Sequence, residues 1–247
     1  MRRSTGKLEA STYLRAFPLL IRHPQIALAP FVASVAEVVL YKVLPGGSGA
    51  GFLGSANSSI AGLVAQLIAF FGLSVALIVA DAAWRRDRAP FDDAWEEARR
   101  KAGDILFASF GLGFVLYIAS LVGSFLGFAG AIALGLIANF FFIYTLPAAA
   151  IGGLPGAAAL NNSVERARSA PLPTAIVTAV YLFAFLYVPS LVTGAVQPFL
   201  LTANLPAPDI ISTLVVAAVK AIVSGYVALV LAKTYAVVSY GRSSARW

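Results

Sequence analysis

The fold is decided by residues 105–151, ILFASFGLGFVLYIASLVGSFLGFAGAIALGLIANFFFIYTLPAAAI, a stretch that contains no charged side chain. A membrane-spanning helix needs about 20 mostly apolar residues. This stretch is about twice that length, so it predicts two spans rather than one. The small residues near Gly127–Gly130 indicate a tight turn between them.

Working outward from this hairpin, four more apolar stretches have the length of a membrane span. The chain is 60% hydrophobic and only 12% charged, whereas soluble domains carry about 25% charged residues. The predicted fold class is therefore all-α, a polytopic membrane protein with one domain over residues 1–247 and six transmembrane helices. The predicted spans lie at about 26–44, 59–80, 105–126, 130–151, 174–197 and 211–238.

The basic residues set the predicted orientation. All Lys and Arg residues except Lys42 and Lys220 fall before the first span, at or beyond the cytoplasmic end of the last span, or in the segments that follow spans two and four. The opposite side holds the uncharged loop 45–58, the turn near Gly127 and a loop whose only charge is Asp209. Because cytoplasmic loops are rich in Lys and Arg, both termini are predicted to be cytoplasmic, in a bacterial inner membrane.

Three short amphipathic segments are predicted to lie on the cytoplasmic surface of the membrane. The first is an interfacial helix over about residues 5–22. The second begins at Pro90, with acidic residues first and basic residues last, which complements a helix dipole. The third is Ser163–Arg168, whose pattern matches Ala94–Arg99. Each segment precedes a pair of spans, so the sequence indicates three repeated hairpin units at about 1–80, 81–152 and 153–247.

Two charges of opposite sign lie inside the predicted spans at similar depth. Glu37 lies about 11 residues into the first span, or roughly 16 Å deep, and Lys220 lies about 10 residues into the sixth. An isolated charge at a helix centre costs about 2.5–3.5 kcal/mol. We therefore predict that Glu37 faces Lys220. Three interpretations remain open: a proton, ion or substrate site, a pair that fixes helix register, or an unpaired arrangement in which Lys220 snorkels and Glu37 is protonated.

The other polar residues indicate packing and headgroup contacts. Gln66 and Asn139 are predicted to form hydrogen bonds between helices. The basic side chains at the cytoplasmic helix ends, together with one histidine, are predicted to face anionic lipid headgroups. This headgroup-facing set is Arg22, His23, Arg85, Arg86, Arg88, Arg99, Arg100, Lys101, Arg166 and Arg168.

Several functional classes are disfavoured by composition. There is no Cys and only one His, so no cofactor and no metal are expected. No nucleophile, base and acid come together in the sequence, so the protein is not expected to be an enzyme. The net charge of +7 is explained by basic helix ends at a membrane surface, so no nucleic-acid partner is expected.

Short motifs carry a resemblance to a known family. The segment Phe17–Pro24, FPLLIRHP, followed by Pro30, resembles the opening of a broad bacterial family of uncharacterised six-span membrane proteins related to the membrane domain of glycerophosphoryl diester phosphodiesterases. Ala94-Trp95 is similar to the second cytoplasmic helix of that family. Tyr144-x-x-Pro147, followed by Ser163 and Arg168, is similar to the third. The resemblance implies a six-helix membrane domain with interfacial helices. It implies no phosphodiesterase activity, which belongs to a separate soluble domain in that family.

The leading functional hypothesis is a non-enzymatic integral membrane protein, a scaffold or lipid-associated module whose partners are anionic membrane lipids. One alternative is an accessory subunit of a larger respiratory, photosynthetic or transport complex, with other membrane subunits as partners. Another is a small transporter that uses Glu37 and Lys220. A large polar cavity reaching the midplane would favour the transporter. Aromatic and small residues facing outward onto a partner or pigment would favour the subunit, and a sealed core with lipid in interfacial grooves would favour the scaffold.

Overall fold

The computed structural model describes residues 10–43, 51–202 and 208–240, and these ranges form helices connected by short turns. No strand occurs within them. The elements are α1 (Ala10–Arg22), η1 (Pro24–Ala27), α2 (Leu28–Val43), α3 (Gly51–Arg86), α4 (Phe91–Arg100), α5 (Ala102–Phe125), α6 (Gly127–Phe142), α7 (Thr145–Ala150), α8 (Gly156–Ser169), α9 (Pro171–Leu186), α10 (Val188–Thr202) and α11 (Pro208–Tyr240).

Five helical stretches of the described chain are long and apolar enough to cross a membrane, and a sixth is added if the bent pair of Ser11–Arg22 and Pro24–Leu40 counts as one span. The five are Ala61–Arg86, Ala102–Phe125, Gly127–Ala150, Pro171–Val196 and Ile210–Ser239. The all-α polytopic fold is thereby confirmed, and the chain is a multi-pass membrane protein.

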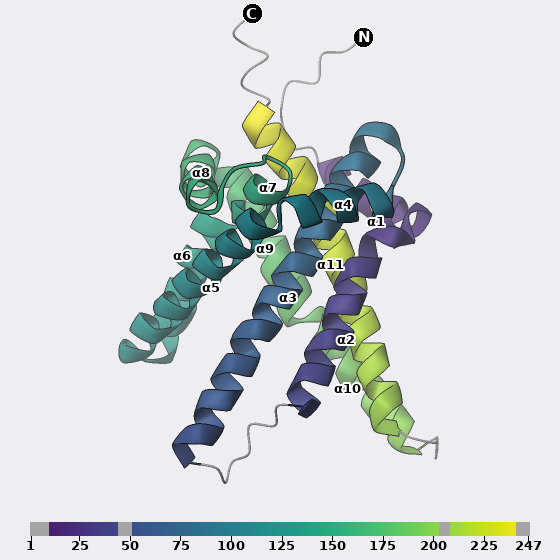
Figure 1. The fold of residues 1–247 in the computed structure, drawn as a ribbon, viewed down its shortest axis with the longest axis vertical. Coiled ribbons are helices and arrows are strands. Elements are labelled where there is room, and N and C mark those ends of the chain that lie inside the picture. Colours follow the sequence, from purple (N-terminus) through teal and green to yellow (C-terminus); the bar gives the residue numbers. More distant parts are fainter. Residues whose placement is uncertain (1–9, 44–50, 203–207, 241–247) are drawn as a thin grey trace, which may run out of the picture.

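Three short helices gather at one end of the molecule, and each precedes a pair of long helical stretches (Figure 1). They are α1, α4 and α8. The first turns into α2 through a bend of 93°. Pro24 begins the short 3₁₀ helix η1 at this bend, where a proline lacks the N–H that a continuous helix would need. With α2 across the membrane, α1 lies close to the membrane plane.

The core lies near the end that carries the short helices. The long helix α11 packs against α2, α3, α9 and α10, and the helices spread apart toward the opposite end (Figure 1). Leu77 of α3, Tyr144 before α7 and Leu229 of α11 are fully buried. Small residues of α11, including Ala228 and Ala232, are also buried. Small side chains let helix backbones approach closely, which is the usual means of helix packing in membranes.

The predicted fourth span is interrupted near the core. Helix α6 ends at Phe142, and α7 starts at Thr145. Pro147 has no N–H to donate to the carbonyl four residues before it. The Ser163 hydroxyl of α8 accepts a hydrogen bond from the Tyr144 N–H at 3.0 Å and donates one to the Phe141 carbonyl at 2.8 Å. Two backbone groups freed by the break are therefore satisfied by α8.

Other helix bounds differ from the sequence prediction at their ends. Helix α3 begins at Gly51 and continues to Arg86, so part of the predicted loop 45–58 is helical and the charged residues after position 80 extend the helix. The predicted fifth span is divided between α9 and α10 at Tyr187, two residues before Pro189. The turn between α5 and α6 lies at Leu126 and Gly127, whose φ of +79° is readily adopted by glycine. Residues 5–9 and 44 lie outside the described residues.

Candidate functional site

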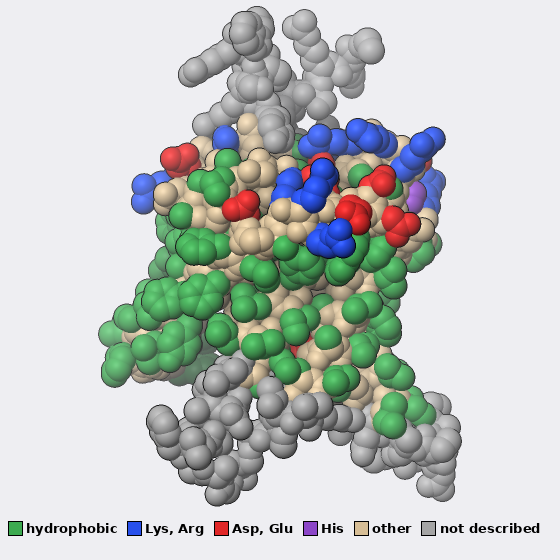
Figure 2. Space-filling model, in the orientation of Figure 1, with side chains coloured by type: hydrophobic (Ala, Val, Ile, Leu, Met, Phe, Trp, Pro, Cys, Tyr) green, Lys and Arg blue, Asp and Glu red, His purple; other side chains and the backbone are tan. Residues whose placement is uncertain are grey.

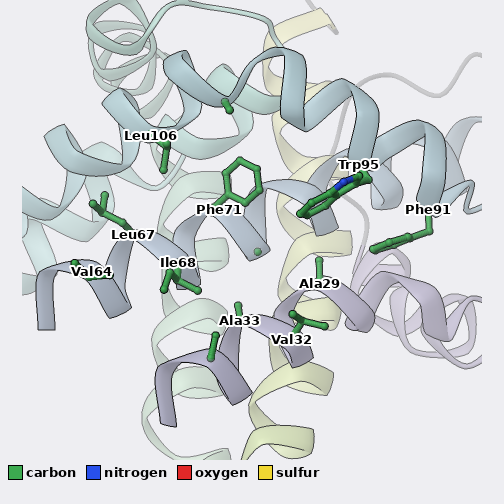
Figure 3. Close-up of a pocket in the computed structure, with 13 residues that line it drawn as sticks. Ala29, Val32, Ala33, Val64, Leu67, Ile68, Phe71, Phe91, Trp95 and Leu106 are labelled. Atoms are coloured by element: carbon green, nitrogen blue, oxygen red, sulfur yellow. The ribbon is translucent and has the colours of Figure 1, made fainter. Parts of the chain in front are cut away.

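An apolar groove of about 570 Å³ lies between four helices, α2, α3, α4 and α5 (Figure 3). Its lining is made of carbon, apart from the indole N–H of Trp95. The lining residues are Ala29, Val32, Ala33, Ala36, Val64, Leu67, Ile68, Phe71, Gly72, Phe91, Trp95, Ala102 and Leu106. Along α2 the lining extends from Ala29 to Ala36, which is about 10 Å of helix.

The interfacial helix α4 closes the groove at the charged end. The ring of Trp95 meets that of Phe71 edge to face, with centroids 5.9 Å apart, and stacks with that of Phe91 at 6.5 Å. Ala94 and Ala98 on the other face of α4 are buried, which brings this helix close against the bundle. Trp95 remains 44% exposed. Tryptophan favours the membrane–water interface, so its position indicates where the groove meets that interface.

Small residues of α2 and α3 form the inner wall. A Cβ atom at Gly72 would lie 2.8 Å from Ala33 Cβ and 3.1 Å from the Ala29 carbonyl oxygen, so the two helices touch there. The alanines at positions 29, 33 and 36 follow helical spacing along one face of α2. They leave space that larger side chains would fill. The groove was not predicted from the sequence, although the spacing of these alanines and the position of Trp95 could have indicated it.

Charged side chains gather in a belt at the same end of the molecule, above a band of hydrophobic side chains (Figure 2). Most of the predicted headgroup-facing set is exposed there. The exposed members are Arg22, Arg85, Arg86, Arg88, Arg99, Arg100 and Arg168.

Three members of that set are partly buried instead. Lys101 donates to Glu97 Oε1 at 2.6 Å and to the carbonyl of Ala150 at 3.1 Å. Lys101 therefore binds the last turn of α7. The prediction that it faces lipid headgroups is wrong. Arg166 has a buried Nε with no partner among the described residues. His23 is the third, and its ring lies against another element of the fold.

His23 connects the α1–α2 bend to the end of α3. Its Nε2 lies 3.2 Å from Oδ1 of Asp87. Asp87 directly follows α3 and has a φ of +49°, the left-handed conformation that aspartate tolerates better than most residues. The contact brings together two segments that are 64 residues apart. It holds the α1–α2 bend against the end of α3, and the Asp87 side chain is 72% exposed.

The structure brings Glu37 and Lys220 together. Lys220 Nζ lies 3.3 Å from Glu37 Oε2 and 3.5 Å from Oε1, where α2 packs against α11. The side chains are 25% and 39% exposed, respectively. This geometry excludes the arrangement in which both charges stay unpaired. It leaves open whether the pair fixes helix register or takes part in transport.

Gln66 and Asn139 lie between helices but differ in their contacts. Gln66 of α3 lies against α5, where a Cβ atom at Gly113 would come within 3.2 Å of its Oε1. Asn139 donates to the carbonyl of Gly135 at 2.8 Å, one turn back in its own helix. The predicted bond between helices is therefore replaced by a bond within α6 at this position.

Within the described ranges, no group of three or more His, Cys, Asp and Glu side chains has an arrangement that could hold a metal ion. Comparisons with known proteins give no family: no family model, no curated protein and no solved structure matches the chain. The class that the fold defines is a multi-pass helical membrane protein with an apolar groove beneath the short helix α4.

Proposed function

We propose that the protein is a non-enzymatic lipid-associated module of a bacterial inner membrane, with both termini cytoplasmic. The groove beneath α4 would hold an acyl chain of a membrane phospholipid. The observation that carries this proposal is the apolar lining of the groove, which is closed by Trp95 of the highly charged helix α4. The orientation is supported by the gathering of Lys and Arg at the end that carries α4.

An acyl chain gains no hydrophobic energy by leaving the bilayer for the groove, because both are equally apolar. Its retention would come from close packing against fixed side chains. Selection of one lipid over another therefore requires polar contacts to the headgroup. The belt offers such contacts, because basic residues near a membrane surface attract anionic headgroups by about 1 kcal/mol each.

Photo-crosslinking tests this proposal directly. The purified chain would be placed in nanodiscs with a phospholipid that carries a diazirine in its acyl chain, irradiated, and digested for mass spectrometry. We expect adducts concentrated on α3 near Val64–Phe71 and on α4 at Trp95. Adducts spread evenly over all exposed apolar faces, including the α5–α6 hairpin, would contradict the proposal.

A matched pair of variants makes the crosslinking test specific. Val64→Phe places a ring in the groove, whereas Val39→Phe adds the same ring on the α2 surface, where Val39 is 53% exposed and does not line the groove. We expect Val64→Phe to lower the adduct yield at Trp95 and Val39→Phe to leave it unchanged. Equal yields in the two variants would contradict binding in the groove.

A second candidate function is a small transporter, favoured by the Glu37–Lys220 ion pair inside the bundle. Transport would require the pair to open and water to reach it. Proteoliposomes loaded with a pH-sensitive dye would report proton movement. A flux that Glu37→Gln abolishes would support the transporter, and no flux above that of empty vesicles would remove proton transport from consideration.

A further inference from the structure

A second hollow, of about 270 Å³, lies on the charged side of α4, between α3, α4 and the end of α7. Its walls differ completely from those of the apolar groove. Five charged side chains line it: Asp81, Arg85 and Arg86 from α3, and Asp93 and Glu97 from α4. The belt as a whole is basic, yet this hollow holds more carboxylates than guanidinium groups.

Three of these five charges are already neutralised by ion pairs. Arg85 Nε lies 2.9 Å from Asp81 Oδ1, and Glu97 Oε1 lies 2.6 Å from Lys101 Nζ. Within the described ranges, no hydrogen bond or ion pair is found for Arg86 or Asp93. The hollow therefore offers one unpaired guanidinium on α3 and one unpaired carboxylate on α4.

We propose that this hollow binds a phosphoethanolamine group, with Arg86 on the phosphate and Asp93 on the ammonium. Guanidinium matches a phosphate with two parallel N–H donors, and a carboxylate accepts from the three N–H donors of a primary ammonium. A glycerol headgroup has no cation to place against Asp93. A trimethylammonium group has a cation but no N–H to donate. A ligand that carries both a phosphate and a primary amine is the one whose charges complement both walls.

This inference rests on the proposed function, because a phospholipid in the neighbouring groove is the natural source of the headgroup. The two hollows lie on opposite sides of α4, which contributes Trp95 to one and Asp93 to the other. Ile78 of α3 lines the charged hollow, and Phe71, about 10 Å back along the same helix, lines the groove. Free phosphoethanolamine is the alternative source of the same chemistry.

Native mass spectrometry of the full chain tests the headgroup preference. The chain would be released from nanodiscs that contain equal amounts of phosphatidylethanolamine, phosphatidylglycerol and phosphatidylcholine. We expect wild type to retain phosphatidylethanolamine over the other two. Asp93→Asn removes one charge-assisted hydrogen bond, so we expect about a tenfold loss of phosphatidylethanolamine retention and a shift toward phosphatidylglycerol. Arg86→Gln should lower the retention of all three lipids, because each carries the phosphate.

Neighbouring residues provide matched controls. Asp92→Asn and Arg88→Gln change the same charges on exposed side chains outside the hollow, and we expect the preference of wild type in both. A wild type that prefers phosphatidylglycerol, or that has no preference, would overturn the headgroup inference. So would an Asp93→Asn variant identical to Asp92→Asn.

The test separates failure of this inference from failure of the proposed function. Lipid retained without any headgroup preference, and lost in Val64→Phe, would overturn the inference and leave the groove proposal standing. The second arm titrates soluble phosphoethanolamine against the chain in detergent, followed by ³¹P NMR line broadening. Broadening that Asp93→Asn removes, in a chain that retains no lipid, would support the hollow as a site for the free compound and overturn the lipid module.

Discussion

Two pairs of helices in this molecule have similar hydropathy and very different surroundings. Over the most apolar 18 residues of α3 and of α11, 56% of the residues are buried. Over the corresponding 18 residues of each of the two spans of the α5–α6 hairpin, 28% are buried. The packed helices bury alanines such as Ala76 and Ala228, and the hairpin exposes rings such as Phe110, Phe114 and Phe128. In a bilayer, apolar side chains need no burial, so packing is decided by small residues and polar contacts rather than by hydropathy.

The largest expected effect contrasts a leucine in each region. Leu229 of α11 is fully buried, whereas Leu136 of α6 is 49% exposed. Leu229→Ala should destabilise the fold by about 2–5 kcal/mol because it leaves a cavity. Leu136→Ala should have little effect, because lipid tails replace the lost contacts. Thermal unfolding in detergent micelles would measure both variants. Equal losses of stability would contradict the difference in packing between the two regions.

The next prediction concerns the polar contact that supports the break between α6 and α7. Ser163→Ala removes both of its hydrogen bonds and leaves the Tyr144 N–H buried without a partner. An unsatisfied buried donor costs about 1–3 kcal/mol. Ser120→Ala, in the hairpin, is the matched control, because Ser120 is exposed. A Ser163→Ala variant as stable as Ser120→Ala would show that the break does not depend on α8.

A close backbone contact within the hairpin lies between Gly123 of α5 and the Gly130–Ala131 backbone of α6. A Cβ atom at Gly123 would lie 2.5 Å from the Ala131 Cα. Gly123→Ala should therefore cost about 1–3 kcal/mol through overpacking, and the damage should stay local. Hydrogen exchange measured by mass spectrometry should rise in α5 and α6 and stay unchanged in α11. A rise in α11 would mean that the hairpin and the core unfold together.

The smallest expected effect is that of the Glu37–Lys220 pair. Glu37→Gln takes the partner from Lys220, but the long side chain of Lys220 can carry its ammonium toward the membrane surface. We therefore expect a cost of about 1 kcal/mol, as for other polar contacts between transmembrane helices. The double variant Glu37→Gln, Lys220→Met should recover most of that loss, because no unpaired charge is left. A double-mutant cycle of unfolding free energies would measure the coupling. Full stability of Glu37→Gln alone would contradict a role for the pair in joining α2 to α11.

Much of the fold could be predicted from the sequence, because the charge and hydropathy of each residue are known without its tertiary contacts. The uncharged stretch 105–151 locates the hairpin, and proline and acidic residues locate the start of α4. The opposite charges of Glu37 and Lys220 pointed to the contact that the structure contains. Such signals require no knowledge of the neighbours of a residue.

The candidate site could not be predicted in the same way. The groove exists because the consecutive helices α2 to α5 leave a space between them when they pack, and its alanines and valines resemble any other apolar residues in the chain. The Lys101 side chain points into the fold because it donates a hydrogen bond to the carbonyl of Ala150, 49 residues later. Arg86 and Asp93 line the same hollow because α3 packs against α4, a placement that depends on tertiary structure.

The central claim is that this chain holds a phospholipid of its own membrane. Native mass spectrometry after gentle extraction from that membrane tests it most directly. The account predicts a lone chain, or copies of this chain, with phospholipid retained at a fixed ratio and lost in Val64→Phe. A chain that carries no lipid and is bound to another membrane protein at a fixed ratio would contradict it and make the protein an accessory subunit.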